Sequence, residues 1–179
     1  MEKKPLVKRK NLRLQDFEYA TPCFYFVTIC TKERKNLFWT PEKLPPTQNL
    51  SDVGVVGAVS GRPHEGLLNK NGKLVELAIL SIPKHYPAYF IDNYVIMPDH
   101  IHLLLQILCD DENGRPMTAP TLNRVINHFK GAVSKRLGFS CWQRSFYDHI
   151  IRNQADYIKH YNYVETNPLL WDNHSKEFL

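Results

Sequence analysis

Four short runs of hydrophobic residues, each bounded by polar or turn-forming residues, predict β-strands. These runs are CFYFVTICT (23–31), AYFIDNYVIM (88–97), HIHLLLQIL (100–108) and SFYDHIIRN (145–153). Pro98 and Asp99 separate the second run from the third and predict a tight turn or a bulge there. The third run is therefore either the continuation of the second strand or its antiparallel partner.

Three other segments place apolar residues at three- and four-residue spacing, which predicts amphipathic helices. Residues 73–82 form the first, which should end at Pro83. Residues 121–138 form the second, with a threonine as a plausible cap at its start and a glycine at its end. The third follows Asn153 as a cap and continues until Pro168 stops it.

Strands interleaved with helices and joined by short links predict an antiparallel α+β sandwich. A chain of 179 residues is most simply a single domain, here spanning residues 1–179. It begins with a basic arm of about residues 1–20. Residues 36–72 are dominated by Pro, Gly, Asn and Ser, and they predict a loop-rich insertion with at most a short helix near residues 51–59.

Composition narrows the class of protein. With 43% hydrophobic residues and charges of both signs, the chain has the composition of a soluble globular protein. It contains neither a run of roughly 18 apolar residues nor the apolar core of a secretion signal, so we expect no membrane association and a cytoplasmic location. The net charge of +5 is compatible with a polyanionic partner and equally with a solvated basic surface.

Two histidines, His100 and His102, stand one residue apart in the third strand. Side chains two apart on a strand point the same way, so both lie on the face opposite to Ile101, Leu103 and Leu105. That apolar face is the core side, and the histidines look out from the other. Two imidazoles fixed in this way form half of a divalent-metal site, and the alternative is two strand histidines with local hydrogen bonds.

The last helix carries Tyr163 and Asn167 four residues apart and therefore on one face. Asn167 offers an amide oxygen suited to Mg²⁺ or Mn²⁺. Tyr163 offers an oxygen nucleophile that needs activation, because the ordinary pKa of a phenol is about 10. The alternative is that the tyrosines of this helix, which include Tyr157 and Tyr161, are core aromatics with their hydroxyls at the rim.

Together these features resemble the HUH endonucleases, in which a His-hydrophobic-His strand is followed by a helix with a tyrosine and a polar ligand. More closely, the chain resembles the single-tyrosine transposases of the smallest insertion sequences, and among them the REP-associated tyrosine transposases. The matching stretches are YFVTICT, YVIMPDHIHLLLQI, INHFKGAVSKRLG, CWQRSFYDHIIRNQADY and YNYVETNP. They cover most of the chain outside residues 36–72.

The resemblance implies a ferredoxin-like antiparallel sheet with helices packed on one face. It also implies action on single-stranded DNA with hairpins, such as REP-like elements or insertion-sequence ends, by a monomer or a homodimer. His100, His102 and Asn167 match the metal ligands, for Mg²⁺ or Mn²⁺, and no nucleotide cofactor is expected. Tyr163 matches the nucleophile, because it lies four residues before the Asn-Pro pair. Tyr161 and Tyr157 are the fallback nucleophiles.

Five basic and aromatic residues are candidates for contact with DNA: Trp142, Arg144, Arg152, Lys159 and Lys130. The aromatic residues Trp142, Phe146 and Tyr147 interleave with Arg144 and Arg152, a pattern that suits base stacking combined with backbone contact on single-stranded DNA. Equally, the aromatic residues are core and the cations merely solvated. Two other functions stay open at this point. One is a catalytically silent DNA-binding protein derived from a transposase, and the other is a metal-dependent phosphohydrolase that uses water.

Overall fold

The computed structural model describes residues 23–40, 66–108, 120–168 and 171. The elements follow in the order β1 (Cys23–Cys30), the 3₁₀ turn η1 (Lys32–Arg34), α1 (Lys70–Leu80), α2 (Ile82–His85), β2 (Tyr89–Ile96), β3 (His100–Ile107), α3 (Leu122–Leu137), β4 (Tyr147–Ile151) and α4 (Gln154–Thr166). The predicted basic arm, about residues 1–20, and the short helix predicted near residues 51–59 lie outside the described residues.

The four strands form one sheet in the order β2–β3–β1–β4, and every neighbouring pair is antiparallel. β3 is therefore the antiparallel partner of β2 and not its continuation. A helix follows β1 and another follows β3, which is the βαββαβ order of a ferredoxin-like fold. The predicted antiparallel α+β fold is confirmed.

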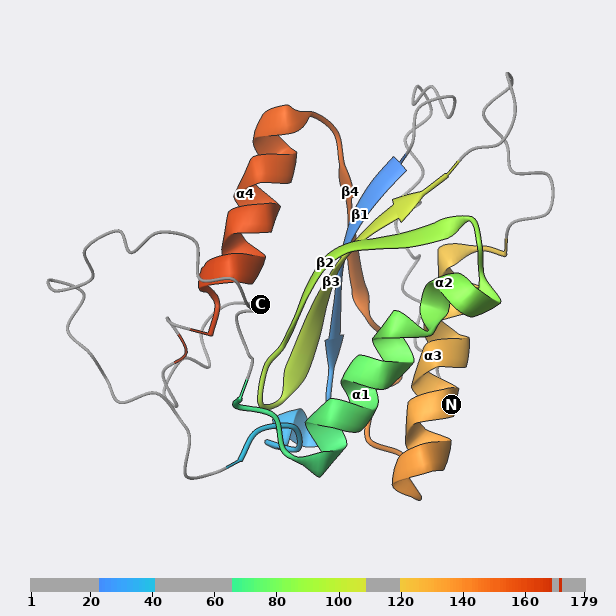
Figure 1. Ribbon diagram of the computed structural model, residues 1–179, viewed down its shortest axis with the longest axis vertical. Helices are drawn as coiled ribbons and strands as arrows, with labels where there is room; N and C mark the ends of the chain where they lie inside the picture. Colours follow the sequence, from blue (N-terminus) through green and yellow to red (C-terminus); the bar gives the residue numbers. More distant parts are fainter. Residues whose placement is uncertain (1–22, 41–65, 109–119, 169–170, 172–179) are drawn as a thin grey trace, which may run out of the picture.

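Helices cover both faces of the sheet (Figure 1). α1 and α3 contact each other and lie on one face, as predicted, whereas α4 contacts β2 and β3 on the other face. An aromatic surface explains the position of α4. Its residues Tyr157 and His160 pack on Phe24 and Phe26 of β1, with ring centres 5.3 and 4.7 Å apart. This second layer was not anticipated from the sequence.

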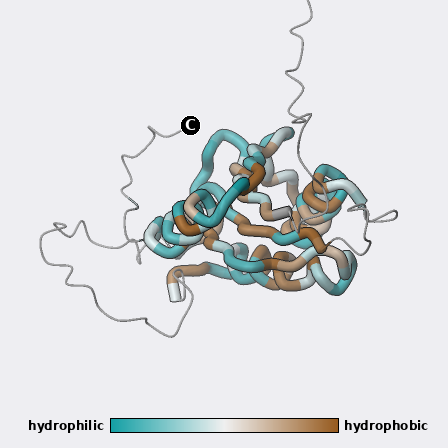
Figure 2. The backbone as a smooth tube through the Cα atoms, turned by 90° about the horizontal axis from the view of Figure 1, so that it is seen from above, coloured by the Kyte–Doolittle hydropathy of each residue, from teal (hydrophilic) through white to brown (hydrophobic). Residues whose placement is uncertain are grey.

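The main core lies between the sheet and the pair α1 and α3. Side chains of β3 alternate as predicted, so that the odd-numbered residues Ile101, Leu103 and Leu105 are fully buried on this side. The helices contribute Val75 and Ile79 from α1 and Val125 and Phe129 from α3. Along the backbone, hydrophobic and hydrophilic stretches alternate, as expected of elements with one buried face (Figure 2). In the described part of the chain, every helix is too short or too polar to span a membrane.

Capping residues explain where the helices begin and end. α1 starts earlier than predicted, because Oδ1 of Asn69 accepts hydrogen bonds from the N–H groups of residues 71 and 72. Pro83 does not end this helix but sits in the first turn of α2, where its missing N–H is tolerated. Asn153 caps α4 as predicted, accepting from the N–H of Asp156 at 2.9 Å.

Both ends of the predicted 36–72 insertion pack against the core. Phe38 and Trp39 are buried, and the indole Nε1 of Trp39 donates to the backbone oxygen of Ile96 at 2.6 Å. Gly72 approaches the backbone so closely that a Cβ there would meet the oxygen of Phe38 at 2.3 Å. The segments on each side of residues 41–65 therefore belong to the folded core.

Candidate active site

His100 and His102 lie side by side at the start of β3, on the face that α4 covers. Their Nε2 atoms are 3.0 Å apart, and both side chains are buried. The face is thus the predicted one, but the histidines do not look out to solvent. Phe26 stacks on His102 with ring centres 5.0 Å apart, and the ring of Trp171 lies 5.8 Å from that of His100.

The outer nitrogen of each histidine has an oxygen partner. Nδ1 of His100 lies 2.6 Å from Oδ1 of Asp99, and Nδ1 of His102 lies 2.8 Å from Oγ1 of Thr28. The second carboxylate oxygen of Asp99 accepts from Nε of Arg34 at 2.9 Å. These contacts fix the orientation of both rings and leave the two Nε2 atoms facing each other.

Arg34 reaches Asp99 from an unusual backbone conformation. Glu33 and Arg34 have φ angles of 59° and 54°, in the left-handed region. For residues other than glycine this region costs of order 1–3 kcal/mol and persists where surrounding contacts determine it. Here Arg34 donates both to Asp99 and, through Nη1, to Sγ of Cys30 at 2.8 Å. The turn η1 therefore holds a guanidinium against the carboxylate behind His100.

Both histidines are neutral at neutral pH. Burial lowers the pKa of His100, and the hydrogen bond and charge of Asp99 act in the opposite direction. Burial also holds the pKa of His102 well below its ordinary value, and the positive charge that a protonated His100 would carry, followed by that of Arg34, acts in the same direction. Neutral imidazole is the form that binds a metal ion.

The pair fits a divalent cation. Two nitrogens at neighbouring corners of an octahedral ion, each about 2.1 Å from it, are about 3.0 Å apart. The two Nε2 atoms have this separation. Metal-binding histidines also typically have an oxygen partner at the outer nitrogen, as both have here. Alternatively, the Thr28 hydroxyl donates to Nδ1 of His102, which then carries a proton on Nε2 and donates it to His100.

Tyr163 lies on α4 directly beside this pair. Its ring centre is 5.1 Å from that of His102, in an edge-to-face arrangement, and 5.9 Å from that of Phe26. The residue is nevertheless 44% exposed. Tyr163 therefore contacts a buried histidine while remaining open to a ligand that arrives from solvent.

The two fallback tyrosines are placed differently. The hydroxyl of Tyr157 donates to Oδ2 of Asp92 at 2.5 Å, and burial together with this carboxylate raises the pKa of the phenol. The ring of Tyr161 lies 5.9 Å from that of Tyr157. Among the described residues, neither ring contacts His100 or His102. The geometry therefore favours Tyr163 as the nucleophile.

A bulge in β2 fixes the helix that carries Tyr163. The pairing of β2 with β3 shifts register between Ile91 and Asn93, which turns Asp92 toward Tyr157. The amide Nδ2 of Asn93 donates to Oε1 of Glu165 at 2.7 Å. Two successive residues of the bulge thus hold α4 at two points.

Asn167 follows the last residue of α4, and its backbone N–H donates to the oxygen of Tyr163 at 3.0 Å. Its side chain is half-buried. In the described part of the chain, neither His100 nor His102 is hydrogen-bonded to the Asn167 amide. The structure brings Tyr163 and the histidines together, whereas Asn167 stays a predicted third ligand.

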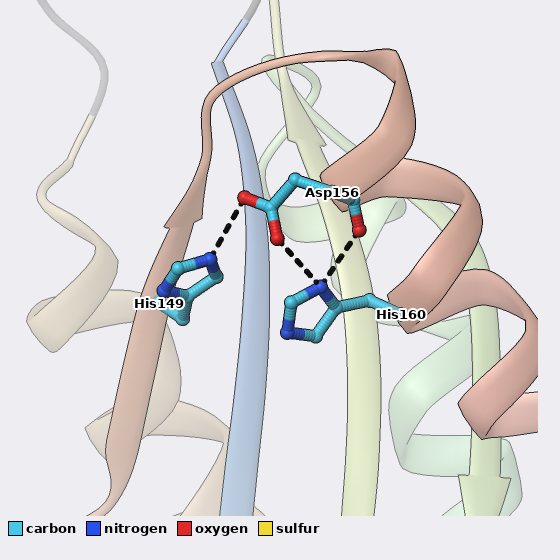
Figure 3. Close-up of side chains that lie close together, drawn as sticks. All are labelled: His149, Asp156 and His160. Atoms are coloured by element: carbon cyan, nitrogen blue, oxygen red, sulfur yellow. Dashed lines mark hydrogen bonds and ion pairs between the residues drawn. The ribbon is translucent and has the colours of Figure 1, made fainter.

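A second group of potential metal ligands, His149, Asp156 and His160, lies between β4 and α4 (Figure 3). Nε2 of His149 is 2.9 Å from Oδ2 of Asp156, and Nδ1 of His160 is 3.1 Å from Oδ1 and 2.8 Å from the backbone oxygen of that residue. A carbonyl oxygen only accepts, so Nδ1 of His160 carries a proton and is not free for a cation. In this arrangement the group ties α4 to β4 through hydrogen bonds.

Three of the five residues predicted to contact DNA, Arg144, Arg152 and Lys159, are exposed. The other two are buried, which does not favour direct contact with DNA. Trp142 is 6% exposed. Lys130 is buried, and its Nζ donates to the backbone oxygens of residues 143 and 144 at 2.7 and 2.9 Å.

Trp142 belongs to the core because it packs between two aromatic rings. Its ring centre lies 5.3 Å from that of Phe38 and 5.9 Å from that of Phe129. Stacking on a nucleobase requires an accessible ring face, which this position does not offer. The interleaved pattern of aromatic and basic residues in the sequence could not separate the core tryptophan from exposed neighbours.

Sequence reasoning missed the residues that surround the histidines. Asp99 could have been noticed, because it directly precedes His100. Thr28 becomes a candidate only when the register pairs it with His102, and Arg34 only through the turn that brings it to Asp99. These partners depend on tertiary structure and leave no signal in local sequence patterns.

Comparison with known proteins finds relatives that include transposases. A Haemophilus influenzae protein named only as uncharacterized is 29% identical over 183 residues, which cover 92% of this chain and 90% of that protein. A second H. influenzae protein, provisionally named a REP-associated tyrosine transposase, is 31% identical over 93 residues (48% of this chain, 52% of that protein). The REP-associated tyrosine transposase of Escherichia coli K12 is 25% identical over 103 residues, 58% of each chain. No family model matches.

The chain is a relative of the REP-associated tyrosine transposases. It spans about half the length of the two relatives that carry this name. A solved structure of a REP-associated tyrosine transposase bound to a REP hairpin covers 88% of this chain and 73% of its own, with a TM-score of 0.52 and 17% identity. At this identity the likeness shows a shared fold. The predicted resemblance to this family is confirmed.

Proposed function

We propose that this protein is a DNA transposase that cleaves and rejoins hairpin-containing single-stranded DNA through a tyrosine–DNA intermediate. The observation that carries the proposal is the contact between Tyr163 and His102, whose Nε2 faces that of His100 at 3.0 Å. A potential nucleophile and a pair of potential metal ligands therefore lie together on two different elements, α4 and β3. The names of the relatives support the same function.

In the proposed reaction, Oη of Tyr163 attacks the phosphorus of a phosphodiester. The new bond joins the phenol oxygen to the 5′ phosphate, the bond to the 3′ oxygen breaks, and that oxygen leaves as a 3′ hydroxyl. The phenol loses its proton to solvent as the leaving oxygen gains one. The phosphotyrosine bond retains the energy needed for rejoining to another 3′ hydroxyl, so no nucleotide cofactor is required.

His100, His102 and the amide of Asn167 are the proposed ligands of Mg²⁺ or Mn²⁺. When bound there, the ion supplies positive charge that offsets the charge growing on the phosphate oxygens. Asp99 and Thr28 orient the two imidazoles through their outer nitrogens.

Exposed cations are present on α4 and next to the two ends of β4. Arg144, Arg152 and Lys159 are available to phosphates, and the net charge of +5 attracts a polyanion. One chain brings Tyr163 to His102 by itself, so a monomer can complete this part of the site, and a homodimer is not required for it. The solved relative bound to a REP hairpin supports a hairpin as the substrate.

A labelled single-stranded oligonucleotide with a hairpin tests the proposal. With Mg²⁺ or Mn²⁺, the chain should form a protein–DNA adduct that survives denaturation, together with a free 3′ hydroxyl fragment. Mass spectrometry of the digested adduct should place the nucleotide on Tyr163 and not on Tyr157 or Tyr161. Cleavage without an adduct would instead indicate hydrolysis by water, and binding without cleavage a silent DNA-binding protein.

Replacing Asp99 by asparagine is expected to weaken Mn²⁺ binding by about 10- to 100-fold. The amide keeps the shape of the carboxylate, but one of its two positions becomes an N–H donor. That donor faces either Nε of Arg34, which is itself a donor, or Nδ1 of His100, which then places its proton on Nε2. Isothermal titration with Mn²⁺ measures the change.

Glu33→Gln is the matched control for Asp99→Asn, because it makes the same chemical change in a neighbouring carboxylate. The Glu33 side chain is exposed and pairs with Lys35. Its replacement should leave Mn²⁺ affinity at the wild-type value. The His102→Ala variant, which lacks one proposed ligand, should give the Mn²⁺ affinity of a protein without the site. Equal affinity of Asp99→Asn and wild type would show that Asp99 does not support the metal ligands.

A further inference from the structure

We propose that Tyr147 is a stacking platform for an unpaired nucleobase within about three nucleotides of the scissile phosphate. This inference rests on the proposed function, since it assigns a further DNA-binding position to the same site. Tyr147 is the first residue of the edge strand β4. It therefore lies on a different element from the histidines of β3 and from Tyr163 of α4.

The strand register places Tyr147 level with His102, on the other side of β1. Thr28 of β1 is paired with His102 on one side and with Tyr147 on the other. Thr28 lies on the α4 face, because its hydroxyl contacts Nδ1 of His102. Paired residues on neighbouring strands share a face, so Tyr147 also lies on this face.

His149 confirms the orientation of β4. It lies two residues after Tyr147, and its ring stacks on that of His160 from α4 with centres 4.8 Å apart. In Figure 3, its side chain projects from β4 toward Asp156 and His160. Because side chains two apart on a strand point the same way, Tyr147 projects to the same side as His149.

Two strand spacings separate β4 from β3, which corresponds to about 10 Å. Stacked nucleotides advance by about 3.4 Å along a strand, so about three nucleotides span this distance. Tyr163 lies over His102 and Phe26, and Tyr147 lies on the far side of Thr28. A strand that places its scissile phosphate at Tyr163 therefore brings a neighbouring base to Tyr147.

Tyr147 has the accessibility that the predicted stacking residue Trp142 lacks. Tyr147 is 53% exposed, against 6% for Trp142. An exposed aromatic ring on an edge strand offers a face for any base, because every nucleobase has a π face. Among the aromatic residues that the sequence interleaves with arginines, the structure therefore favours Tyr147 over Trp142 as the stacking position.

The charges around Tyr147 suit a nucleic-acid strand. Exposed arginines, Arg144 and Arg152, flank β4 at its two ends. The carboxylate of Asp156, which lies between α4 and β4 on the same face, accepts hydrogen bonds from His149 and from the N–H of Arg152 and so presents less negative charge to a phosphate. This combination of a free aromatic ring and flanking cations is typical of single-strand binding surfaces.

A hairpin oligonucleotide with an unpaired flank tests the inference, with 2-aminopurine placed in turn at each flanking position. Stacking on an aromatic ring quenches this fluorescent base. Wild type and Tyr147→Phe should quench it at one or two adjacent positions, and Tyr147→Ala should not. Because one stacked base contributes about 1–3 kcal/mol, Tyr147→Ala should also bind the flanked hairpin roughly 5- to 150-fold more weakly.

Phe90→Ala is the matched control, because Phe90 is also 53% exposed and lies on β2, the opposite edge of the sheet. The Phe90→Ala variant should quench 2-aminopurine and bind the flanked hairpin to the same extent as wild type. Unchanged quenching in Tyr147→Ala, equal loss in Phe90→Ala, or no binding of the oligonucleotide by wild type would each overturn the inference. Quenching through Tyr147 in a chain that forms no adduct would retain the platform and reject only the covalent mechanism. An adduct without this quenching would retain the covalent mechanism and reject the platform.

Discussion

Replacement of Tyr163 by phenylalanine is expected to abolish the protein–DNA adduct, with a loss of cleavage on the order of 10³-fold or more. The change removes only the hydroxyl oxygen, so the ring contacts with His102 and Phe26 remain possible. Metal affinity and binding of the uncleaved hairpin should therefore stay within about twofold of wild type, since neither depends on the phenol oxygen. Denaturing gels, Mn²⁺ titration and a mobility-shift assay measure the three quantities.

Tyr161→Phe provides the control, because it removes a hydroxyl from the same helix two residues away. Tyr161 makes its ring contact with Tyr157 and none with the histidines among the described residues. Its loss should leave adduct formation unchanged. An adduct that persists in Tyr163→Phe and disappears in Tyr161→Phe would move the nucleophile to Tyr161. Equal cleavage by both variants without any adduct would point to water as the nucleophile.

Local periodicity predicted the parts of the site that depend on a single element. The alternation of β3 placed His100 and His102 on one face, opposite to Ile101, and the structure has them there. The cap at Asn153 and the proline after α4 fixed the helix that carries Tyr163 within a residue. These features follow from backbone geometry that neighbouring residues determine, so one sequence suffices.

Features that depend on two or more distant elements were not predictable in this way. Residue patterns did not indicate that α4 would cover the histidines, because that position follows from aromatic packing on β1. Only the family resemblance implied that Tyr163 lies at the histidine pair. The partners of the imidazoles come from β1 and from the loop before β3, and Arg34 reaches its carboxylate through a left-handed turn. Such contacts arise from strand register and from a rare backbone conformation, which no periodic pattern encodes.

The burial of Trp142 likewise depends on contacts between distant elements, which the sequence pattern did not reveal. An aromatic residue between polar neighbours is a candidate for base stacking and for the core alike, and only the packing decides. The bridge between Thr31 and Trp142 extends the sheet region beyond β1 and brings the indole under Phe38. Phe38 itself lies in the segment that composition assigned to a loop-rich insertion.

Replacement of Trp142 by alanine is expected to lower the free energy of unfolding by about 3–5 kcal/mol. The indole is buried between Phe38 and Phe129, so its removal leaves a cavity that the surrounding rings cannot close. Domains are typically stable by only about 5–15 kcal/mol, so the loss is a large fraction of the total. Thermal unfolding should show a fall in Tm of about 6–20 °C.

Two variants separate this core role from a role in DNA binding. Trp142→Phe should lower the free energy of unfolding much less than Trp142→Ala does. It keeps an aromatic ring and removes an indole N–H that has no hydrogen-bond partner in the described part of the chain. Tyr147→Ala, at an exposed position, should change the free energy of unfolding by only about 0.5 kcal/mol. If Trp142→Ala instead kept wild-type stability and lost affinity for single-stranded DNA, the indole would have to be accessible. The packing of Phe38 and Phe129 against it would then be wrong, and so would the argument that transfers the stacking position to Tyr147.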